Sequence, residues 1–401
     1  MLATKSIKQS YQQNNDLDSM METFRQMVNY CIRLGLESNI STLKKFSSLH
    51  YKDLEKYNIQ SKYKLTAMSQ ACGRLAQMKK DIKKGKTPKY PYVQKSFLVS
   101  CYGFKINGQL LSIPVGDRRH IHIILNYHTQ AILSDKSLKV KSFVITPDSI
   151  SLCVQKEVEE IECNSTIGID RNLRNVTVGN HDKVTMYDMS DIPEITHRAK
   201  KIISSFKRND HRIRQKIYSK ISNRRARRVK QFLNRISKDI VQKARESKSI
   251  IVFEDLKGIR KLYKKGNGQG KKYRGIMNSW SFYELQRQIQ YKADWKGIPV
   301  RFVSPVRTSI LCPICGDRTQ EDRAQHRQVW CSSCKKLMDR DIVAAMNISY
   351  KGLQKFCNPS GLSEKAMRGN LDNAMPVILR VDGSKLSQQP EMTELIKEKD
   401  Q

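Results

Sequence analysis

The chain has 401 residues, with 74 lysines and arginines against 38 aspartates and glutamates, which gives a formal net charge of +36. Such a charge repels itself unless a polyanion offsets it, and here it is spread over most of the chain instead of one cluster or one amphipathic helix. The composition therefore indicates a nucleic-acid partner and disfavours both a metabolic enzyme with one anionic substrate and a peripheral membrane protein.

No segment of the sequence has the pattern of a signal peptide or of a membrane span. The opening residues MLATKSIKQS contain no apolar core of the kind that signal peptides need. No stretch of about 18 apolar residues occurs either. Six of the ten cysteines are scattered singly, which is typical of reduced, intracellular thiols. We therefore expect a cytoplasmic protein without a membrane partner.

The first 160 residues change from a helical to a strand-like pattern. Residues 1–15 begin with an alternating segment that predicts a short strand. Apolar residues at spacings of three and four then predict helices across 16–85, and the lysine-rich segment 79–89 closes this region. From 97 to 160 the period becomes two, which predicts a small antiparallel barrel or sandwich. The acidic run 157–162 marks a domain boundary.

The middle of the chain alternates predicted strands with helices. Residues 165–188 predict three strands. Sixteen lysines and arginines and a single acid lie between Arg198 and Lys238, and a narrow apolar face predicts a long basic helix through 198–246. The run KSIIVFEDL has the length of a buried strand. The Gly- and Lys-rich stretch 257–274 contains no acid and predicts a mobile basic loop, either a lid or a linker.

Two more predicted helices and one strand surround a cysteine cluster. SFYELQRQIQYKADWKG predicts an amphipathic helix, and IPVRFVSP predicts a strand. The cluster spans 312–334 and is followed by DRDIVAAMNISYKGL, which predicts a further helix. After Phe356 no aromatic residue occurs, and polar residues, Gly and Pro predominate, so we expect a disordered tail.

Two CxxC pairs, Cys312 with Cys315 and Cys331 with Cys334, are separated by 15 residues. This spacing is typical of a structural zinc site, in which four thiolates close a tetrahedral shell and leave no open position for catalysis. Redox pairs and two disulfides are the alternatives, but redox CxxC motifs occur singly before a helix, and this chain is basic and intracellular in character. We predict one structural Zn²⁺ and interpret His326, between the pairs, as a surface or strand residue.

Three carboxylates stand where apolar strands end or where a helix begins. Asp170 follows the run IGI, Glu254 follows IIVF, and Asp341 opens the helix after the cysteines. An unpaired buried carboxylate costs several kcal/mol, whereas Mg²⁺ binds a few carboxylates together with water and phosphate oxygens. Two such ions ~3.5–4 Å apart promote phosphodiester hydrolysis. Asp255 and Asp339 lie too close for spacing alone to choose among the acids, so a nuclease of the RNase H type and a structural role both stay open.

The same residues resemble a known family. IGIDRNLRNVTVG, IVFEDLKG and CPIC…CSSC…DRDIVAAMNI resemble the three RuvC motifs and the embedded zinc ribbon of TnpB proteins. These are the OrfB-type proteins of insertion sequences, which are similar to compact type V CRISPR nucleases. The resemblance is specific over roughly 165–350 and extends more loosely upstream, where KYPYVQKS and FKINGQLLSIP resemble the wedge strands of the family.

The resemblance implies a Mg²⁺-dependent, RNA-guided endonuclease that cuts double-stranded DNA. The implied partners are a guide RNA from the element's own end and a target DNA with a short adjacent motif. By motif position, Asp170, Glu254 and Asp341 are the catalytic residues and the ligands of two Mg²⁺ ions, with Asp341 selected over Asp339. The Asn that the family has in DRDxNAA is Val343 here, which removes one polar neighbour. A nucleoid-associated location in a prokaryote follows from this activity.

The resemblance also implies a multidomain α+β fold. Its main part is an RNase H-like (RuvC) α/β nuclease domain with an inserted zinc ribbon, joined to a small wedge β-barrel and a short helical recognition lobe. The implied segments are 1–15 for the first wedge strand, 16–88 for the recognition lobe, 89–162 for the wedge barrel, 163–353 for the nuclease domain with the ribbon at 305–338, and 354–401 for a disordered tail.

Nucleic-acid contacts are expected along the basic helix 198–246 and the loop 257–274. Cations at this density neutralise backbone phosphates without reading sequence, and a solvated surface helix is the alternative. Tyr90, Tyr92 and Tyr102 could stack on bases, with core packing as the alternative role. The basic residues predicted to bind nucleic acid are Arg212, Arg214, Arg224, Arg225, Arg227, Arg228, Lys264 and Lys265.

The sequence leaves other functions open. The main alternative is a guided DNA-binding protein with weak or no cleavage, acting as a repressor or targeting factor, although all three acids are present. An unguided zinc-ribbon protein would bind no preferred RNA. A transposase that joins DNA ends itself is disfavoured, because no Tyr or Ser nucleophile motif stands out. A CRISPR effector differs only in genomic context, and the sequence does not decide between a monomer and a homodimer.

Overall fold

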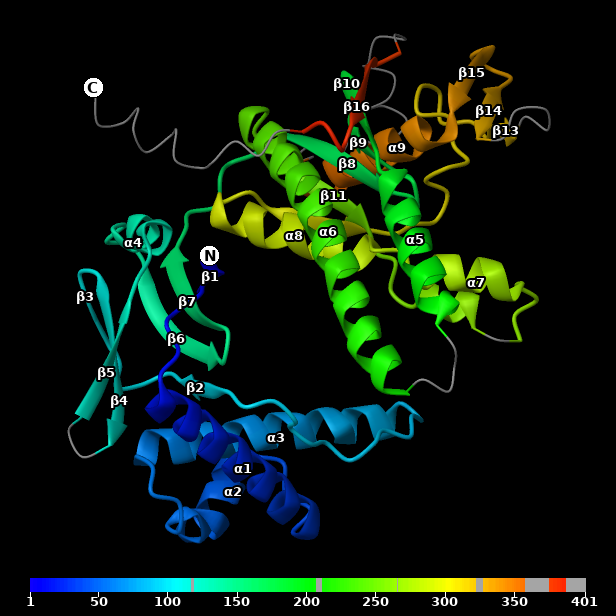
Figure 1. Cartoon of the computed structure of the whole chain (residues 1–401). Helices are drawn as coiled ribbons and strands as arrows, with labels where there is room; N and C mark the ends of the chain where they lie inside the picture. The colour runs from blue at the N-terminus through cyan, green and yellow to red at the C-terminus, as the bar shows by residue number, and fades with distance from the viewer. Residues whose placement is uncertain (117–118, 207–210, 265, 322–326, 358–374, 387–401) are drawn as a thin grey trace. The chain divides into compact units, whose positions relative to one another are not determined.

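Two compact units make up the computed structural model of the chain (Figure 1). The N-terminal unit is Leu2–Glu157, and the C-terminal unit is Val158–Gln401 together with Met1. Both combine helices with sheets, which confirms the predicted multidomain α+β fold. No helix in the described part combines the length and hydropathy needed to cross a membrane. The structure describes residues 1–116, 119–206, 211–264, 266–321, 327–357 and 375–386.

Helices form the first part of the N-terminal unit, as predicted for 16–85, but breaks divide them. Asn14 caps the first helix, because its side-chain oxygen accepts the backbone N–H groups of Asp16 and Leu17. The elements are α1 (Asn15–Glu37), α2 (Leu43–His50), the 3₁₀ turn η1 (Lys52–Leu54) and α3 (Ser61–Lys83).

Two antiparallel sheets complete this unit, as the period of two predicts. One has the strand order β1-β7-β6-β2 and the other β3-β4-β5. Helices and sheets share one hydrophobic core, in which Phe24, Tyr63 and Phe143 are fully buried. The elements are β1 (Leu2–Gln9), β2 (Leu98–Ser100), β3 (Lys105–Asn107), β4 (Leu110–Gly116), β5 (Arg119–Ile124), α4 (Tyr127–Leu133), β6 (Lys139–Thr146) and β7 (Ser149–Glu157).

A six-stranded mixed sheet with the order β12-β11-β8-β9-β10-β16 is the centre of the C-terminal unit. β11 runs parallel to β8 and β12, whereas β9 is antiparallel to β8 and β10. The strands predicted in 165–188, KSIIVFEDL and IPVRFVSP are confirmed. The strands are β8 (Ser165–Arg171), β9 (Asn175–Gly179), β10 (Lys183–Asp188), β11 (Ser249–Glu254), β12 (Val300–Val303) and β16 (Val377–Asp382).

Helices cover both faces of this sheet, because successive side chains of a strand point to opposite sides (Figure 1). Phe253 belongs to the core that α6 and α8 share, whereas Val252 packs with Ile348 of α9. Gly168 lets α9 lie close, since a Cβ there would overlap the Ala345 carbonyl oxygen. The helices are α5 (Asp191–Ser205), α6 (His211–Glu246), α7 (Lys271–Met277), α8 (Phe282–Trp295) and α9 (Arg340–Phe356), with the 3₁₀ turn η2 (Ile259–Tyr263).

Three predicted segments differ from the structure. The basic stretch 198–246 is two helices, because α5 ends at Ser205 and α6 begins at His211. The predicted loop 257–274 contains η2 and the start of α7. The predicted disordered tail from 354 is wrong in its described part, since α9 runs to Phe356 and β16 pairs in parallel with β10. The open edge of β10 supplies the backbone partners that a strand needs, even though the segment of β16 contains no aromatic residue of its own.

Candidate active site and zinc centre

Asp170 and Glu254 lie at neighbouring strand ends of the C-terminal unit. β8 and β11 run parallel, and the last pair in their register is Ile169 with Phe253. Asp170 and Glu254 are the next residues of the two strands. Asp341 lies in the first turn of α9, where Asp339 caps the helix by accepting the backbone N–H of Asp341 at 2.8 Å. Asp341 is only 3% exposed. The fold thus brings together the three carboxylates that the motifs single out.

The charges of Glu254 and Asp341 disfavour the ionised form of the buried Asp170. Burial, and then the charges of Glu254 and Asp341, raise the pKa of Asp170 to about 7. Burial also raises the pKa of Glu254, although a hydrogen bond from Thr308 and the charge of Arg171 oppose that shift. A divalent cation would relieve this repulsion, and carboxylate oxygens are the ligands that Mg²⁺ prefers. The donor set therefore fits magnesium.

The carboxylates are spread more widely than the ligands of one closed metal site. Among the described residues, the four cysteines are the one group of three or more His, Cys, Asp or Glu side chains whose ligand atoms all lie within 4.8 Å of one another. The three carboxylates do not meet this limit as a set. A pair of ions ~3.5–4 Å apart spans more space than a single ion does. The number of ions stays a prediction.

Three neutral side chains that the sequence analysis did not single out hold the carboxylates. Asn172 and Asn175 belong to the motif IGIDRNLRN, so a signal for them was present beside Asp170. Thr308 carries no such signal, because it is distant in sequence from every predicted acid. The hydrogen bonds run from the Asn172 amide to Asp170 at 2.7 Å, from the Asn175 amide to Asp341 at 2.9 Å and from the Thr308 hydroxyl to Glu254 at 2.5 Å.

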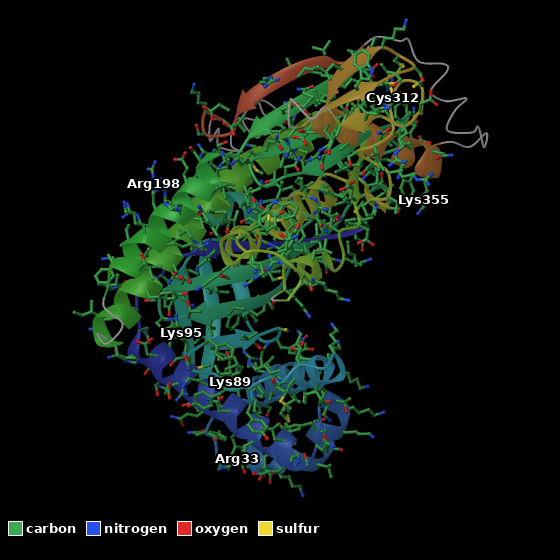
Figure 2. The ribbon with its side chains drawn as sticks, turned by 90° about the vertical axis from the view of Figure 1, so that its right-hand side faces the viewer. Arg33, Lys89, Lys95, Arg198, Cys312 and Lys355 are labelled. Carbon is green, nitrogen blue, oxygen red and sulfur yellow. The ribbon has the colours of Figure 1, made fainter. Side chains whose placement is uncertain are left out.

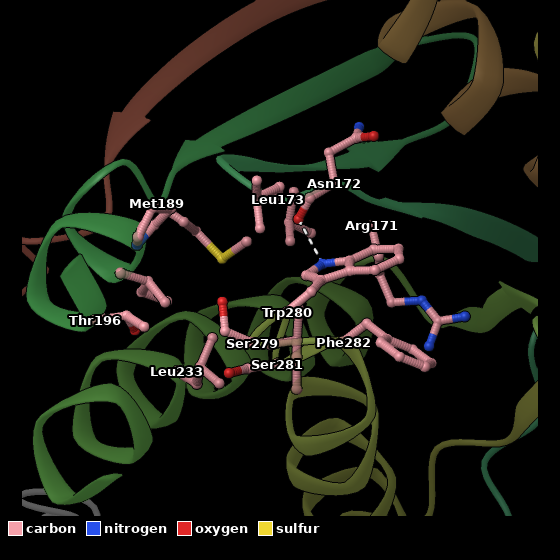
Figure 3. Close-up of a pocket in the computed structure, with 14 residues that line it drawn as sticks. Arg171, Asn172, Leu173, Met189, Thr196, Leu233, Ser279, Trp280, Ser281 and Phe282 are labelled. Atoms are coloured by element: carbon pink, nitrogen blue, oxygen red, sulfur yellow. Dashed lines mark hydrogen bonds between the residues drawn. The ribbon is translucent and has the colours of Figure 1, made fainter. Parts of the chain in front are cut away.

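Trp280 anchors the turn that carries Asn172. The indole N–H of Trp280 donates to the Asn172 carbonyl oxygen at 2.9 Å (Figure 3). The indole borders a mainly apolar pocket, with Met189 and Leu233 on other walls (Figure 3). Because Asn172 also holds Asp170, the packing of Trp280 fixes one polar neighbour of the candidate site.

Arg327 forms an ion pair with Asp341 from the segment just before β14 (Gln328–Cys331). Its Nε lies 3.2 Å from Oδ2 of Asp341, and a terminal guanidinium nitrogen contacts Oδ1. The backbone of Arg327 has a φ of +77°, and its carbonyl oxygen accepts the Arg340 N–H at 2.8 Å. The ribbon thus places the positive charge of Arg327 next to Asp341, a predicted metal ligand. No sequence motif pointed to Arg327.

Val343 occupies an apolar environment. It is fully buried in a cluster with Cys312 and Val329, so this position of α9 packs against the cysteine ribbon. Asp341 nevertheless has an amide neighbour, because Asn175 reaches it from β9. The strand β9 therefore supplies an amide to Asp341, whereas the family's Asn at position 343 is a valine in this chain.

Asn347 ties α9 to the segment that enters the ribbon. Its side-chain amide donates to the carbonyl oxygens of Thr308 at 2.8 Å and Leu311 at 2.7 Å, and the residue is 1% exposed. Thr308 in turn holds Glu254. Through Thr308, Asn347 of α9 therefore supports Glu254 at the end of β11, a role that the sequence analysis did not assign.

The four predicted zinc ligands converge in a small ribbon of three strands, and Figure 2 labels Cys312 there. The Sγ atoms of Cys312 and Cys334 are 3.8 Å apart, and those of Cys315 and Cys331 are 3.5 Å apart. A disulfide needs about 2.05 Å, whereas four thiolates at a Zn–S distance of about 2.3 Å lie roughly 3.8 Å apart. The cluster therefore fits a zinc ion, while His326 lies outside the described residues. The strands are β13 (Gln320–Glu321), β14 (Gln328–Cys331) and β15 (Lys336–Asp339).

The basic residues predicted on α6 lie on its outer side. Arg224, Arg227 and Arg228 are exposed and Arg225 is half-buried, whereas apolar residues of the same helix enter the core. Lys264, after η2, is exposed as well. Their exposure leaves these side chains accessible to phosphates, and their contacts with nucleic acid stay a prediction. The side chains of Arg212 and Arg214, and residue Lys265, lie outside the described part of the chain.

The three tyrosines weighed for base stacking are all exposed in the N-terminal unit. The exposed fractions are 77% for Tyr90, 66% for Tyr92 and 63% for Tyr102. The Tyr92 hydroxyl accepts a hydrogen bond from Arg25 at 3.2 Å. The alternative prediction that these tyrosines pack in the core is therefore wrong, and base stacking stays a prediction.

The fold and the site define an α+β protein with a four-cysteine ribbon directly ahead of an acid-bearing helix. A family model described as the Cas12f1-like TNB domain matches residues 282–348, which hold α8, the ribbon and the first half of α9. Among solved structures, Cas12f1 in its complex with sgRNA and target DNA is similar in fold, with a TM-score of 0.60 and 16% identity. That match covers 83% of this chain and 81% of that chain.

Curated relatives then show the family. TnpB-like protein MJ0751 of Methanocaldococcus jannaschii is 32% identical over 269 residues, which cover 62% of this chain and 92% of that protein. The CRISPR-associated endodeoxyribonuclease Cas12f1 of Sulfoacidibacillus thermotolerans is 32% identical over 124 residues, which cover 31% of this chain and 27% of that protein. The chain belongs to the TnpB-like family and is related to the compact type V nucleases, as its motifs predict.

Proposed function

We propose that this chain is an RNA-guided endonuclease that cleaves double-stranded DNA by two-metal hydrolysis and is associated with a transposable element. The observation that carries the proposal is the convergence of three carboxylates where β8 and β11 end and α9 begins. The net charge of +36 and the family support it, since one relative is named an endodeoxyribonuclease and the structurally similar Cas12f1 was solved with sgRNA and target DNA.

The proposal assigns a role to each unit. The six-stranded sheet with its helices is the RuvC-like nuclease domain, and the ribbon inside it holds a structural zinc ion. The N-terminal unit contributes the wedge strands and the recognition helices, within the segment boundaries expected from the sequence. The basic face of α6 and the residues around η2 contact the backbone of guide RNA or target DNA.

The residues of the site have separable roles in this mechanism. Asp170, Glu254 and Asp341 would hold two Mg²⁺ ions, which supply an activated water and stabilise the leaving oxygen of the phosphodiester. Asn172 bonds one oxygen of Asp170, and Thr308 bonds one oxygen of Glu254, so each carboxylate keeps its second oxygen for a cation. Because burial and like charges raise the pKa of Asp170 to about 7, proton and metal compete for this carboxylate near neutral pH.

The direct test of the function begins with the RNA. The protein is expressed with its native flanking DNA, and the RNA that co-purifies is sequenced. We expect one abundant species with a constant structured part and an end that matches the neighbouring sequence. Cleavage assays on duplexes that match this end then separate a nuclease from a guided protein that only binds. A broad mixture of host RNA would contradict guidance and favour an unguided zinc-ribbon protein.

Thr308→Val should slow cleavage without abolishing target binding. A hydrogen bond to a charged group contributes ~1.5–3 kcal/mol, so losing the orientation of Glu254 lowers the single-turnover rate about 10- to 150-fold. Thr308→Ser keeps the hydroxyl and should restore most of the rate. A valine variant that cleaves as fast as the unaltered protein would show that this hydrogen bond does not position Glu254.

Replacing Arg224, Arg227 and Arg228 together by alanine should weaken nucleic-acid binding and make it less sensitive to salt. Each lost phosphate contact reduces the slope of log affinity against log salt by about 0.9 for duplex DNA. The matched control replaces Lys136, Lys139 and Lys141, which are exposed in the N-terminal unit and carry the same charge. Equal slopes for the two triple variants would mean that net charge, not α6, sets the affinity.

A further inference from the structure

Two adjoining hollows connect α6 with Glu254, one of the three candidate catalytic carboxylates. The first, about 1000 Å³ with its open mouth, lies against α6 and is lined in part by Arg225 and Lys230. The second, about 810 Å³ with its open mouth, has Glu254 among its lining residues. Arg260 and Tyr283 line both hollows, so the two spaces meet at these side chains.

The first hollow has the charge of a phosphate-binding surface. Four basic side chains line it, and the one acid among its lining residues is Glu284. Glu284 pairs with Arg287 at 2.8 Å, which leaves the lining strongly positive. Such a surface attracts a nucleic-acid backbone irrespective of its sequence. Through Arg225, it connects the basic face of α6 with the interior of the C-terminal unit.

The second hollow combines aromatic rings with cations. Tyr283 is 63% exposed at the start of α8, and the neighbouring Phe282 has the Arg260 guanidinium 5.6 Å from its ring centroid. The one acid beside Glu254, Asp255, pairs with Lys257 at 2.9 Å. Exposed rings next to cations are the usual platform for the bases of a single strand, because every base presents a π-face.

We propose that the two hollows form a track for one DNA strand, in which Tyr283 stacks on a base next to the scissile phosphate. The inference rests on the proposed nuclease function, since it takes Glu254 as a ligand of the catalytic ions. A base reaches the ring of Tyr283 only when it is unstacked from its neighbours, so the occupant is a single strand and not a duplex. The backbone of this strand follows the cations of the first hollow toward α6.

The test combines a variant of the protein with a variant of the substrate. The guide-loaded protein cuts a matched target, the cut position is mapped, and an abasic nucleotide then replaces each base beside it in turn. At one position we expect the abasic substrate to slow the unaltered protein about 5- to 150-fold, as loss of one aromatic stack does. Tyr283→Ala should show the same loss on the normal substrate and no further loss on the abasic one.

Tyr283→Phe is the matched control, because it keeps the ring and should retain the normal rate. The exposure of Tyr283 makes unfolding of the alanine variant unexpected, and an unchanged melting temperature checks this. If Tyr283→Ala cuts as fast as the unaltered protein, or if the two losses multiply, the track is overturned while the nuclease function stands.

A second measurement decides the track without cleavage. Ca²⁺ replaces Mg²⁺, and a fluorescent 2-aminopurine replaces the base at the mapped position, or each unpaired base in turn if nothing is cut. The unaltered protein and Tyr283→Phe should both quench the 2-aminopurine fluorescence. The emission should recover in Tyr283→Ala. Absence of cutting by the unaltered protein would count against the proposed function alone, whereas equal emission with all three proteins would overturn the track.

Discussion

Asp170→Ala is expected to abolish DNA cleavage while target binding stays intact. The carboxylate lies at the end of β8 beside Glu254 and Asp341, and its removal would take away one of the three acids that would hold the proposed Mg²⁺ ions. Metal stabilisation of a phosphodiester transition state is worth several kcal/mol, so the rate should fall by roughly a thousandfold or more. Single-turnover cleavage and a filter-binding assay on the same guide-loaded protein measure the two properties separately.

Asp182→Asn is the matched control for this experiment. Its side chain is 69% exposed in the turn between β9 and β10 of the same unit, so the change also removes one acid but should leave cleavage unaffected. Cleavage by Asp170→Ala at the unaltered rate would remove Asp170 from the site. Loss of cleavage and of binding together would indicate a folding defect, which the melting temperature would reveal.

Cys312→Ser is expected to remove the zinc ion from the protein and to destabilise the C-terminal unit. Structural zinc in small sites contributes ~10–16 kcal/mol of apparent binding free energy, and two of the predicted zinc ligands, Cys312 and Cys331, belong to the small buried cluster of this ribbon. Because the segment entering the ribbon carries Thr308, and the ribbon carries Arg327, its collapse should disturb both Glu254 and Asp341. Cleavage should therefore fall together with the zinc content.

Metal analysis of the purified variant, together with its melting curve, tests this expectation. Cys101→Ser is the control, because Cys101 is an exposed, free thiol in the N-terminal unit. It should keep one zinc per chain and an unchanged melting temperature. Full zinc occupancy in Cys312→Ser would contradict the four-thiolate site, and normal cleavage after zinc loss would contradict the link between the ribbon and the carboxylates.

The sequence by itself determined the features that depend on short-range patterns. The CxxC pairs of Cys312 and Cys331 restrict the geometry of their thiols through two intervening residues, so their spacing predicted a cluster that fits zinc. Strand periods identified β8 and β11, and the motifs around Asp170 and Glu254 pointed to the family that the relatives show. The charge of +36 is a property of composition and needs no fold.

Asn172 belongs to the same motif as Asp170, but only the tertiary structure decided the contacts of the acids with polar groups outside their own motifs. Thr308 lies 54 residues from Glu254, and Trp280 lies 108 residues from Asn172. Arg327 is 14 residues from Asp341, but it belongs to the ribbon and not to the helix that carries this acid. The strand β16 depends in the same way on an open edge of β10, which nothing local in its own segment announces. Tyr283 became a candidate only because two hollows meet at its ring.

The difference has a physical cause. A motif records residues whose chemistry is tied to their own backbone segment, such as a helix cap at Asp339 or two thiols one turn apart. A hydrogen bond between distant segments depends on how sheets, helices and ribbon pack, because burial makes an unpartnered polar group costly whatever its place in the chain. The family motifs therefore pointed to the three acids as candidates, whereas Thr308, which bonds Glu254, became a candidate only in the fold.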